Sequence, residues 1–421
     1  MVNKVKVALI GAGQRGEVYT DYALKRPLEM ELVAVADPNE RRREKFKAAH
    51  GIPEENCFKD WQELLSKPRL ADAVLICTQD KQHFEPTMQA LKAGYHVLLE
   101  KPMSTSPEEC LLMGQESEKS DRIFSICHVL RFTPFFTKIK GLLAEGRIGR
   151  LMSIQHNENV GYWHHAHSYV RGNWRNTAES SPMILAKSCH DMDILLWLAG
   201  DECTHISSFG MLSHFKSENA PQGAPLRCLD GCPAASTCPY YAPDMYLTEN
   251  IDWPTSVIST DLSFEGRVKA LKEGPYGRCV YHCDNDVVDH QVVNMEFANE
   301  VTATFTMSAF TNEPSRTIKL MGTGGEIRAA LEKNEIEVTY FDSGYKETIS
   351  LEVPGGHIGH GGGDHRLIED FLAMVREGKT SRGLTSASYS VSSHLMAFAA
   401  ETSRLEKRVV HLPDYVRSIL A

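Results

Sequence analysis

The chain has 421 residues, of which 42% are hydrophobic and 24% are charged, as is usual for a globular protein. One hydrophobic core rarely covers such a length, so two domains are expected. The net charge of −10 argues against nucleic-acid and anionic-membrane partners, because phosphates repel an acidic surface.

The start of the sequence passes directly into a strand pattern and lacks the apolar core and cleavage site of a signal peptide. No apolar run approaches the roughly 20 residues of a membrane span. These features predict a cytoplasmic protein, in which the 11 cysteines would be mostly reduced.

The first predicted domain covers residues 1–128, and within it residues 5–100 alternate between short apolar runs and helix-length amphipathic segments. The apolar runs cover residues 5–10, 32–36, 74–77 and 96–99. Near-continuous apolar strands separated by helices are typical of a parallel sheet covered on both faces. We therefore predict an N-terminal Rossmann domain, which binds ligands at the carboxyl ends of its strands.

Beyond residue 128 the pattern changes to alternating polar and apolar residues. The alternating segments cover residues 151–157, 291–297, 301–307 and 336–340. Helical patterns lie near residues 182–199, 364–377 and 384–405. Alternation predicts a largely antiparallel sheet with one wet face. The second domain, residues 129–421, is thus expected to be α+β with a large open sheet, and the cysteine-rich residues 215–285 are interpreted as an insertion.

A glycine motif, Gly11-Ala12-Gly13-Gln14-Arg15-Gly16, lies between the first strand and the first helix. Gly11 permits the tight turn, Gly13 lets a pyrophosphate approach the backbone, and Gly16 lets the helix pack closely on the strand. The helix N-terminus stabilises phosphate charge. In this context the motif, with Gln14 and Arg15, predicts a dinucleotide-binding site.

Asp37 ends the second predicted strand. An acidic side chain at this position can accept hydrogen bonds from the adenine ribose hydroxyls, which favours NAD as the cofactor. Arg41, Arg42 and Arg43 follow closely and could receive the 2′-phosphate of NADP. They could equally form a solvated helix face.

Glu100-Lys101-Pro102 follows the apolar run that ends at residue 99. Together with the glycine motif, it resembles the glucose–fructose oxidoreductase, inositol dehydrogenase and rhizopine-catabolism (Gfo/Idh/MocA) family over nearly the whole chain. The resemblance implies a Rossmann domain followed by an open-sheet domain that often serves oligomerisation, so a homo-oligomer is expected. It also implies NAD(P) chemistry on sugars, cyclitols or related polyols.

The resemblance implies roles for individual residues as well. Lys101 is expected to point into the active site, ahead of a cis proline, and its place just past a parallel strand agrees with this role. The other positions that the resemblance places at the cofactor are Thr78, His83, Glu100, Trp174 and Arg175.

An amphipathic helix is predicted from residue 182 to about residue 197, with Lys187 and His190 on one face. A nearby ammonium disfavours the protonated imidazole and keeps His190 available as a neutral base. Such a base suits proton removal from a carbinol oxygen while hydride leaves for nicotinamide. In the resembling family an aspartate commonly lies four residues before this histidine, where this chain has Ala186. Lys187 and Lys101 are expected to take over part of its role.

Tyr162-Trp163-His164-His165 and His167 follow the first strand of the second domain. Aromatic and imidazole groups combine apolar faces with polar tips, which suits a sugar ring. Tyr162 and His164 are therefore predicted to line the substrate site, and a solvated aromatic loop is the alternative.

A glycine- and histidine-rich segment at 355–363 precedes Asp364. Its histidines could reach the substrate, and Asp364 is expected to cap the helix that follows.

Five cysteines lie in the insertion, as Cys228-x3-Cys232-x5-Cys238 and Cys279-x3-Cys283. Four thiolates suit a structural zinc ion. The predicted ligands are Cys228, Cys232, Cys238 and Cys283, with Cys279 as the substitute. Free thiols or a disulfide are the alternatives.

The sequence thus predicts an NAD(P)-dependent oxidoreductase that oxidises a hydroxyl of a sugar, glycoside or cyclitol. The alternative is an NAD-dependent glycoside hydrolase, in which transient oxidation, elimination and re-reduction release an aglycone. A non-catalytic NAD-binding sensor is disfavoured because the candidate catalytic groups are present.

Overall fold

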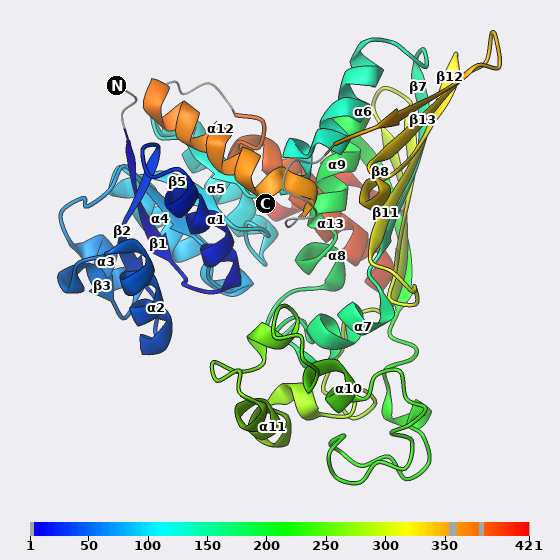
Figure 1. Cartoon of the computed structure of the whole chain (residues 1–421). Helices are drawn as coiled ribbons and strands as arrows, with labels where there is room; N and C mark the ends of the chain where they lie inside the picture. Colours follow the sequence, from blue (N-terminus) through cyan, green and yellow to red (C-terminus); the bar gives the residue numbers. More distant parts are fainter. Residues whose placement is uncertain (1–3, 353–359, 379–382, 421) are drawn as a thin grey trace.

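The computed structural model describes residues 4–352, 360–378 and 383–420. Two sheets organise the molecule, a six-stranded sheet near the N-terminus and a nine-stranded sheet in the second half (Figure 1). The mixed α/β architecture agrees with the sequence prediction. In the described part of the chain, no helix is both long and apolar enough to cross a membrane.

The N-terminal sheet is wholly parallel, with the strand order β3-β2-β1-β4-β5-β6. Its strands are β1 (Val5–Ile10), β2 (Met30–Ala36), β3 (Cys57–Phe58), β4 (Ala73–Ile76), β5 (His96–Leu99) and β6 (Phe124–Ile126). The helices between them are α1 (Gln14–Lys25), α2 (Glu40–His50), α3 (Trp61–Ser66), α4 (Phe84–Lys92) and α5 (Pro107–Lys119). The strand order reverses between β1 and β4, and a ligand crevice forms beyond the carboxyl ends of strands at such a switch point.

The C-terminal sheet has the order β14-β13-β12-β11-β7-β10-β9-β8-β15. Its strands are β7 (Leu151–Asn159), β8 (Cys203–Met211), β9 (His290–Phe297), β10 (Thr302–Ser308), β11 (Ser315–Gly322), β12 (Gly325–Ala330), β13 (Glu335–Tyr340), β14 (Lys346–Ser350) and β15 (Val410–His411). Seven of its pairings are antiparallel, and β7 with β10 is the parallel one. The alternating segments therefore form the mainly antiparallel sheet that the sequence predicts.

Helices cover one face of this sheet. The helices of the second half are α6 (Pro134–Ala144), α7 (Tyr162–His165), α8 (Met183–Ala186), α9 (Cys189–Ala199), α10 (Ala242–Tyr246), α11 (Phe264–Glu273), α12 (Gly363–Glu377), α13 (Ala387–Glu406) and α14 (Leu412–Leu420). Helices α9 and α13 pack against β7 and β8 (Figure 1). On the other face, side chains such as Phe209 and Met211 are exposed.

Helix α12 returns to the N-terminal domain although it lies far along the chain (Figure 1). Its buried residues Leu367, Ile368 and Phe371 join the same hydrophobic cluster as Val5 and Val7 of β1. A division of the chain at residue 128 therefore leaves out one helix that completes the N-terminal core.

The insertion at 215–285 contains α10, α11 and short 3-10 turns, and it lies at the lower end of the view in Figure 1. Its apolar side chains form two small clusters. One of these clusters includes Ala166 and Val170, which directly follow α7. The insertion is thus packed against the segment that the sequence predicts to line the substrate site.

Candidate active site

The glycine loop has the backbone geometry that a dinucleotide requires. Gly11 has φ +93°, and a β-carbon there would lie 2.6 Å from the carbonyl carbon and oxygen of Cys77. A β-carbon on Gly16 would lie 2.5 Å from the Gly11 carbonyl oxygen. At Gly13 nothing lies within 4 Å of that position, so the N-terminus of α1 is open on the side where a pyrophosphate would approach. The residues present fit a bound dinucleotide.

Asp37 braces this loop from the end of β2. Its buried carboxylate accepts hydrogen bonds from the backbone N–H of Ala12 at 2.9 Å and of Asn39 at 2.8 Å. Arg42 Nη1 lies 3.8 Å from Asp37 Oδ2. Arg41 points elsewhere and donates to Thr260 Oγ1 of the insertion at 3.0 Å. Of the three consecutive arginines, Arg42 thus lies beside the Asp37 carboxylate, and Arg41 reaches the insertion.

Arg15 links the glycine loop to two distant elements. Its guanidinium donates to Glu100 Oε1 and to Asp364 Oδ1, each at 2.6 Å. Tyr19 also donates to Glu100 Oε1 at 2.8 Å. Burial raises the pKa of Asp364, but Arg15 and His360 outweigh it and hold this pKa well below its ordinary value.

The expectation that Asp364 caps α12 is wrong. The N-cap residue is Gly362, and no side chain caps the helix. The carboxylate of Asp364 is engaged by Arg15 and by His360 Nδ1 at 3.2 Å. Residues 355–359 of the preceding segment, including His357, lie outside the described residues. Of the two histidines in this segment, His360 is the one that the structure describes, and it lies at the site.

Lys101 spans from the first domain to the second. The Lys101–Pro102 peptide bond is cis, as the resemblance implied. Lys101 Nζ donates to the carbonyl oxygen of Ala186 at 2.8 Å. His83 supports this loop, because its ring nitrogens lie 2.6 Å from the Pro102 oxygen and 3.1 Å from the Thr78 oxygen.

The predicted single helix at 182–199 is broken at Lys187 and Ser188. Helix α8 ends at Ala186 and α9 begins at Cys189. Lys187 and His190 therefore do not lie one turn apart on a common helix face. The break leaves the Ala186 carbonyl available to Lys101 and turns Lys187 toward β7.

His190 lies among other histidines. Its ring centroid is 6.0 Å from that of His128 and 5.7 Å from that of His360. Burial lowers its pKa well below the ordinary value, and the nearby charge of Lys101 lowers it further. The prediction named Lys187 as the cation that keeps His190 neutral, whereas Lys101 is the cation whose charge adds to the effect of burial on His190. Within the described residues His190 Nδ1 is buried without a hydrogen-bond partner.

Lys187 belongs to a buried network of charges. Its Nζ lies 3.2 Å from Glu158 Oε1, and Arg316 Nη2 lies 2.6 Å from Glu158 Oε2. Arg316 also pairs with Asp191 at 2.9 Å, and His156 Nε2 lies 2.7 Å from the same carboxylate. Burial lowers the pKa of Lys187, with Glu158 opposing and Arg316 adding to the shift. This chain has Ala186 where the resembling family commonly has an aspartate. The carboxylate that pairs with Lys187 is instead that of Glu158.

Trp174 and Arg175 face different neighbours. Trp174 Nε1 donates to Asp80 Oδ1 at 3.1 Å, and Ser181 donates to the other oxygen of Asp80 at 2.8 Å. Arg175 pairs with Asp284 of the insertion at 2.9 Å. Trp174 therefore contacts the first domain close to Thr78, whereas the guanidinium of Arg175 fastens the insertion.

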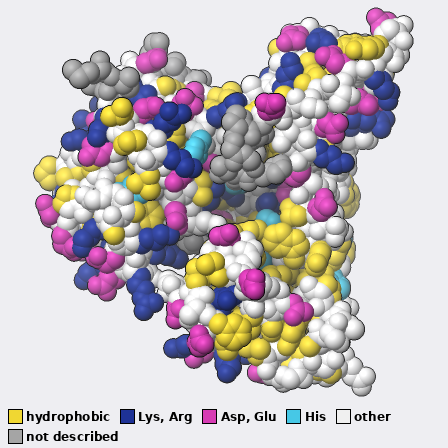
Figure 2. Space-filling model, in the orientation of Figure 1, with side chains coloured by type: hydrophobic (Ala, Val, Ile, Leu, Met, Phe, Trp, Pro, Cys, Tyr) yellow, Lys and Arg dark blue, Asp and Glu magenta, His cyan; other side chains and the backbone are white. Residues whose placement is uncertain are grey.

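The segment 162–167 forms an aromatic wall beside Lys187. Burial lowers the pKa of His164 well below its ordinary value, and the charge of Lys187 lowers it further. Tyr162 and Trp163 are partly exposed. Figure 2 shows a hollow between the N-terminal domain and the insertion, with hydrophobic side chains gathered along it over α7. The predicted substrate residues Tyr162, His164, Lys187 and His190 all belong to this half of the molecule.

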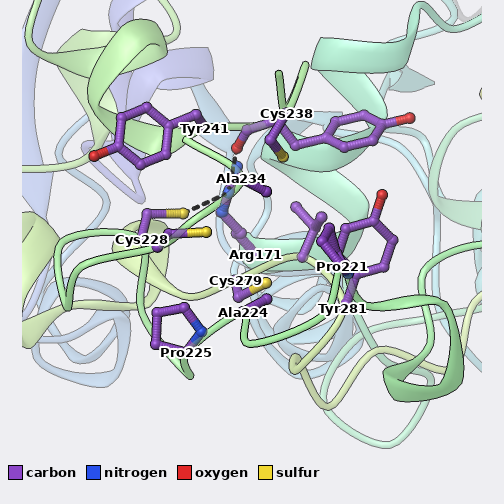
Figure 3. Close-up of a pocket in the computed structure, with 13 residues that line it drawn as sticks. Arg171, Pro221, Ala224, Pro225, Cys228, Ala234, Cys238, Tyr241, Cys279 and Tyr281 are labelled. Atoms are coloured by element: carbon purple, nitrogen blue, oxygen red, sulfur yellow. Dashed lines mark hydrogen bonds between the residues drawn. The ribbon is translucent and has the colours of Figure 1, made fainter. Parts of the chain in front are cut away.

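The cysteines of the insertion differ from the predicted grouping. Cys228, Cys232, Cys238 and Cys279 line one small pocket together with Arg171 (Figure 3). Cys283 does not line it, and its thiol donates to the Cys279 carbonyl oxygen at 3.3 Å. All five are free thiols. Cys279, named as the substitute, therefore replaces Cys283 in the group.

The structure does not support the zinc prediction. Over residues 4–352, 360–378 and 383–420, no three His, Cys, Asp or Glu side chains are placed to hold a metal ion. Arg171 Nη2 points at the Cys228 sulfur at 3.7 Å and donates to the Tyr240 carbonyl oxygen at 2.6 Å (Figure 3). A buried guanidinium therefore lies among these thiols and contacts one of the predicted ligands, Cys228.

Several residues of the site were not predicted. Glu158 and His156 occupy buried positions of β7 on the same face as Ile154, so a charged residue at an inward position was a signal that could have been used. Arg316 is likewise a charged residue at a buried position of β11, on the same face as Ile318. Asp80 and His128 carry no comparable local pattern, because only the tertiary fold brings them to the site.

Two family descriptions match the chain. Residues 5–128 match an oxidoreductase family with an NAD-binding Rossmann fold. Residues 136–328 match a GFO/IDH/MocA C-terminal domain.

Curated proteins and solved structures show the same likeness. The putative oxidoreductase YteT of Bacillus subtilis is 24% identical over 393 residues, which cover 86% of this chain and 87% of that protein. The myo-inositol 2-dehydrogenase of Thermotoga maritima is 28% identical over 208 residues, or 49% of this chain and 58% of that protein. A levoglucosan dehydrogenase, solved with NADH and levoglucosan, aligns with a TM-score of 0.73 and 19% identity, covering 98% of this chain and all of that one.

Proposed function

Because the chain belongs to the Gfo/Idh/MocA family of NAD-binding oxidoreductases, we propose that it oxidises a hydroxyl group of a sugar, glycoside or cyclitol. One observation carries the proposal. Lys101, at the end of a parallel strand in the first domain, reaches Ala186 of the second, beside His190 and Lys187. These three groups meet where the crevice of a doubly wound sheet opens.

NAD is the proposed cofactor. The loop Gly11–Gly16 and Thr78 would hold it, with Asp37 beside the adenine ribose. Bound nicotinamide would supply an acceptor for hydride. Asp37 favours NAD because a carboxylate repels a 2′-phosphate, and the neighbouring Arg42 is the group that would admit NADP.

His190 is the proposed base. Its lowered pKa keeps the imidazole neutral near pH 7, so one ring nitrogen can accept the proton of the substrate hydroxyl. Lys101 holds a positive charge beside that oxygen, which stabilises the negative charge that develops as the proton leaves. The carbon loses hydride and the oxygen loses a proton, which gives a ketone.

Lys187 orients the substrate in this proposal. Glu158 and Arg316 fix its ammonium group, so it can donate to a second hydroxyl of the ring. Tyr162 and His164 provide the apolar wall. The named relatives are dehydrogenases, which does not favour the glycoside hydrolase alternative.

The test follows NADH and released aglycone together. Purified protein receives NAD and a panel of cyclitols, sugars and p-nitrophenyl glycosides. NADH that accumulates with the carbohydrate, without free p-nitrophenol, supports the proposal. Release of p-nitrophenol in large excess over the NAD present would replace it with the hydrolase cycle. His190→Gln with unchanged NAD affinity and a loss of about 10²–10⁴ in kcat is expected of a general base.

We also propose that the outer face of the C-terminal sheet joins copies of this chain. Phe209 is 60% exposed and Met211 is 55% exposed on β8, and Val292 of β9 lies opposite Phe209 in the sheet. Exposed apolar side chains in one patch favour association. Light scattering of the wild type and of Phe209→Lys tests this, since the substitution should shift the mass toward the monomer.

A further inference from the structure

The insertion brings a second tryptophan to the aromatic wall. Trp253 lies with its ring centroid 5.4 Å from that of Trp163 and 4.9 Å from that of His164. Trp163 and His164 belong to α7, whereas Trp253 comes from the insertion. All three side chains are partly exposed. Two indoles from different segments thus form one surface next to a predicted substrate residue.

This surface adjoins the contact between the two domains. Trp253 contacts His164 in an edge-to-face arrangement, and the His164 ring centroid lies 6.2 Å from that of Tyr169. The Tyr169 ring lies 6.3 Å from that of Trp174, which donates to Asp80 of the first domain. Farther along the insertion, Thr260 accepts a hydrogen bond from Arg41 of the first domain. The segment from Trp253 to Thr260 therefore runs alongside the hollow between the domains, over which hydrophobic side chains gather near α7 (Figure 2).

We propose that Trp253 and Trp163 form a subsite for the second ring of a glycoside, so that the substrate is a disaccharide or an aryl glycoside. The proposal rests on the proposed function, because it places this ring beside the hydroxyl that is oxidised. A sugar presents C–H groups on its faces, and these pack well on indole rings. Both indoles are partly exposed, so their faces are open to a second ring.

The insertion holds Trp253 firmly enough for such a role. Next to α7, His167 Nδ1 pairs with the Tyr246 hydroxyl at 2.9 Å, and the His167 ring lies 5.5 Å from Trp253. Arg171 donates to the Arg278 carbonyl oxygen at 2.7 Å, and Arg175 pairs with Asp284. A rigid aromatic surface loses little conformational entropy when a ring binds to it.

The experiment compares matched substrates in the wild type. Methyl glucoside, cellobiose, maltose and p-nitrophenyl glucoside are offered with NAD, and kcat/KM is measured from NADH formation. We expect at least one two-ring substrate to exceed the methyl glycoside by about tenfold, the size of effect that one well-packed ring provides. Trp253→Ala should bring this ratio close to one and leave kcat/KM for the methyl glycoside within about twofold.

Two variants guard against a folding artefact. Trp253→Tyr keeps an aromatic ring and should restore most of the ratio. Phe264→Ala removes an aromatic ring that is 55% exposed elsewhere on the insertion, and it should leave the ratio unchanged. A ratio near one in the wild type, or an equal loss for both substrates in Trp253→Ala, overturns the subsite.

A binding measurement separates this proposal from the proposed function. Calorimetric titration of the protein with NADH present compares cellobiose or maltose with methyl glucoside. Tighter binding of the disaccharide that Trp253→Ala abolishes, without NADH formation from any substrate, would sustain the subsite and reject the oxidation. NADH formation without any two-ring preference in rate or binding would sustain the oxidation and reject the subsite. The absence of both NADH formation and a two-ring preference would reject both proposals.

Discussion

Arg15 and Asp364 lie 349 residues apart in the sequence and are joined by a hydrogen-bonded ion pair of 2.6 Å. Arg15 is in the first turn of α1, at the cofactor loop, and Asp364 is at the start of α12. The pair therefore fixes a late helix to the element that is expected to bind pyrophosphate. Glu100, one residue before Lys101, shares the same guanidinium, so the cofactor loop and the lysine loop are coupled through one side chain.

Asp364→Asn should weaken both folding and cofactor binding. Arg15 keeps Glu100 as a partner and its side chain is 28% exposed, so the expected loss is about 1–2 kcal/mol, below that of a fully buried pair. Urea unfolding and a fluorescence titration with NADH measure the two effects. Glu31→Gln, which breaks the exposed pair with Lys4, is the control and should change neither. Unchanged NADH affinity in Asp364→Asn would contradict the coupling.

Gly11→Ala should destabilise the fold, whereas Gly13→Ala should leave stability unchanged and weaken cofactor binding. The new methyl group at position 11 would lie 2.6 Å from the Cys77 backbone at a positive φ, whereas at position 13 it meets nothing within 4 Å. Gly11→Ala is therefore expected to lose about 1–3 kcal/mol of stability. Gly13→Ala should unfold like the wild type and still bind NAD more weakly, because its methyl group occupies the approach to the backbone. Unfolding and NAD titration of both variants decide this.

Lys101→Met should raise the pKa of His190. Burial and the charge of Lys101 both lower this pKa, so removal of the charge moves it upward, toward about 6.5. Since the neutral imidazole is the active base in our proposal, the acid limb of residual kcat/KM moves to higher pH. Histidine NMR titration, assigned with His190→Gln, measures the pKa directly. Lys187→Met should leave it in place, and an equal shift in both variants would contradict the assignment to Lys101.

Asp191→Asn should cost about 3–5 kcal/mol of unfolding free energy, because it leaves Arg316 buried with one carboxylate fewer. Arg316 and His156 outweigh burial and hold the pKa of Asp191 well below its ordinary value. A carboxyl with a depressed folded pKa stabilises the protein above its unfolded pKa of about 3.9 and loses this contribution as the pH falls through the folded value. The difference between wild type and variant should therefore stay constant from pH 7 to 5 and shrink below about pH 4. Urea melts at these pH values test it.

Local patterns were sufficient for the parts of the site that depend on local geometry. Gly11 lies in the tight turn after β1 and Gly16 packs closely against it from α1, as the glycine motif predicts. The cis Lys101–Pro102 bond is the one that the family resemblance implied. Parallel and antiparallel strands could also be distinguished from the sequence. Strands buried on both faces are almost continuously apolar, whereas strands with one solvated face alternate between apolar and polar residues.

The remaining features depend on contacts between distant segments. No proline or glycine at Lys187 indicates that the helix breaks there. The break coincides with the hydrogen bond that Lys101 Nζ donates to the Ala186 carbonyl oxygen. Arg175 pairs with Asp284 of the insertion rather than pointing to the cofactor site. Cys279, not Cys283, lies with the other thiols. The folding of the insertion determines both arrangements. No spacing rule within one segment contains that information.

The return of α12 to the first core has a consequence for the newly made chain. Residues up to 128 leave the ribosome first, yet the partners of Val5 and Val7 in α12 come near residue 370. At translation rates of 5–20 residues per second, the intervening stretch of about 250 residues takes roughly 12–50 s to make. Throughout that interval the apolar surface that α12 later covers stays open to water and to other chains. A gene fragment that ends at residue 128 would keep it open permanently.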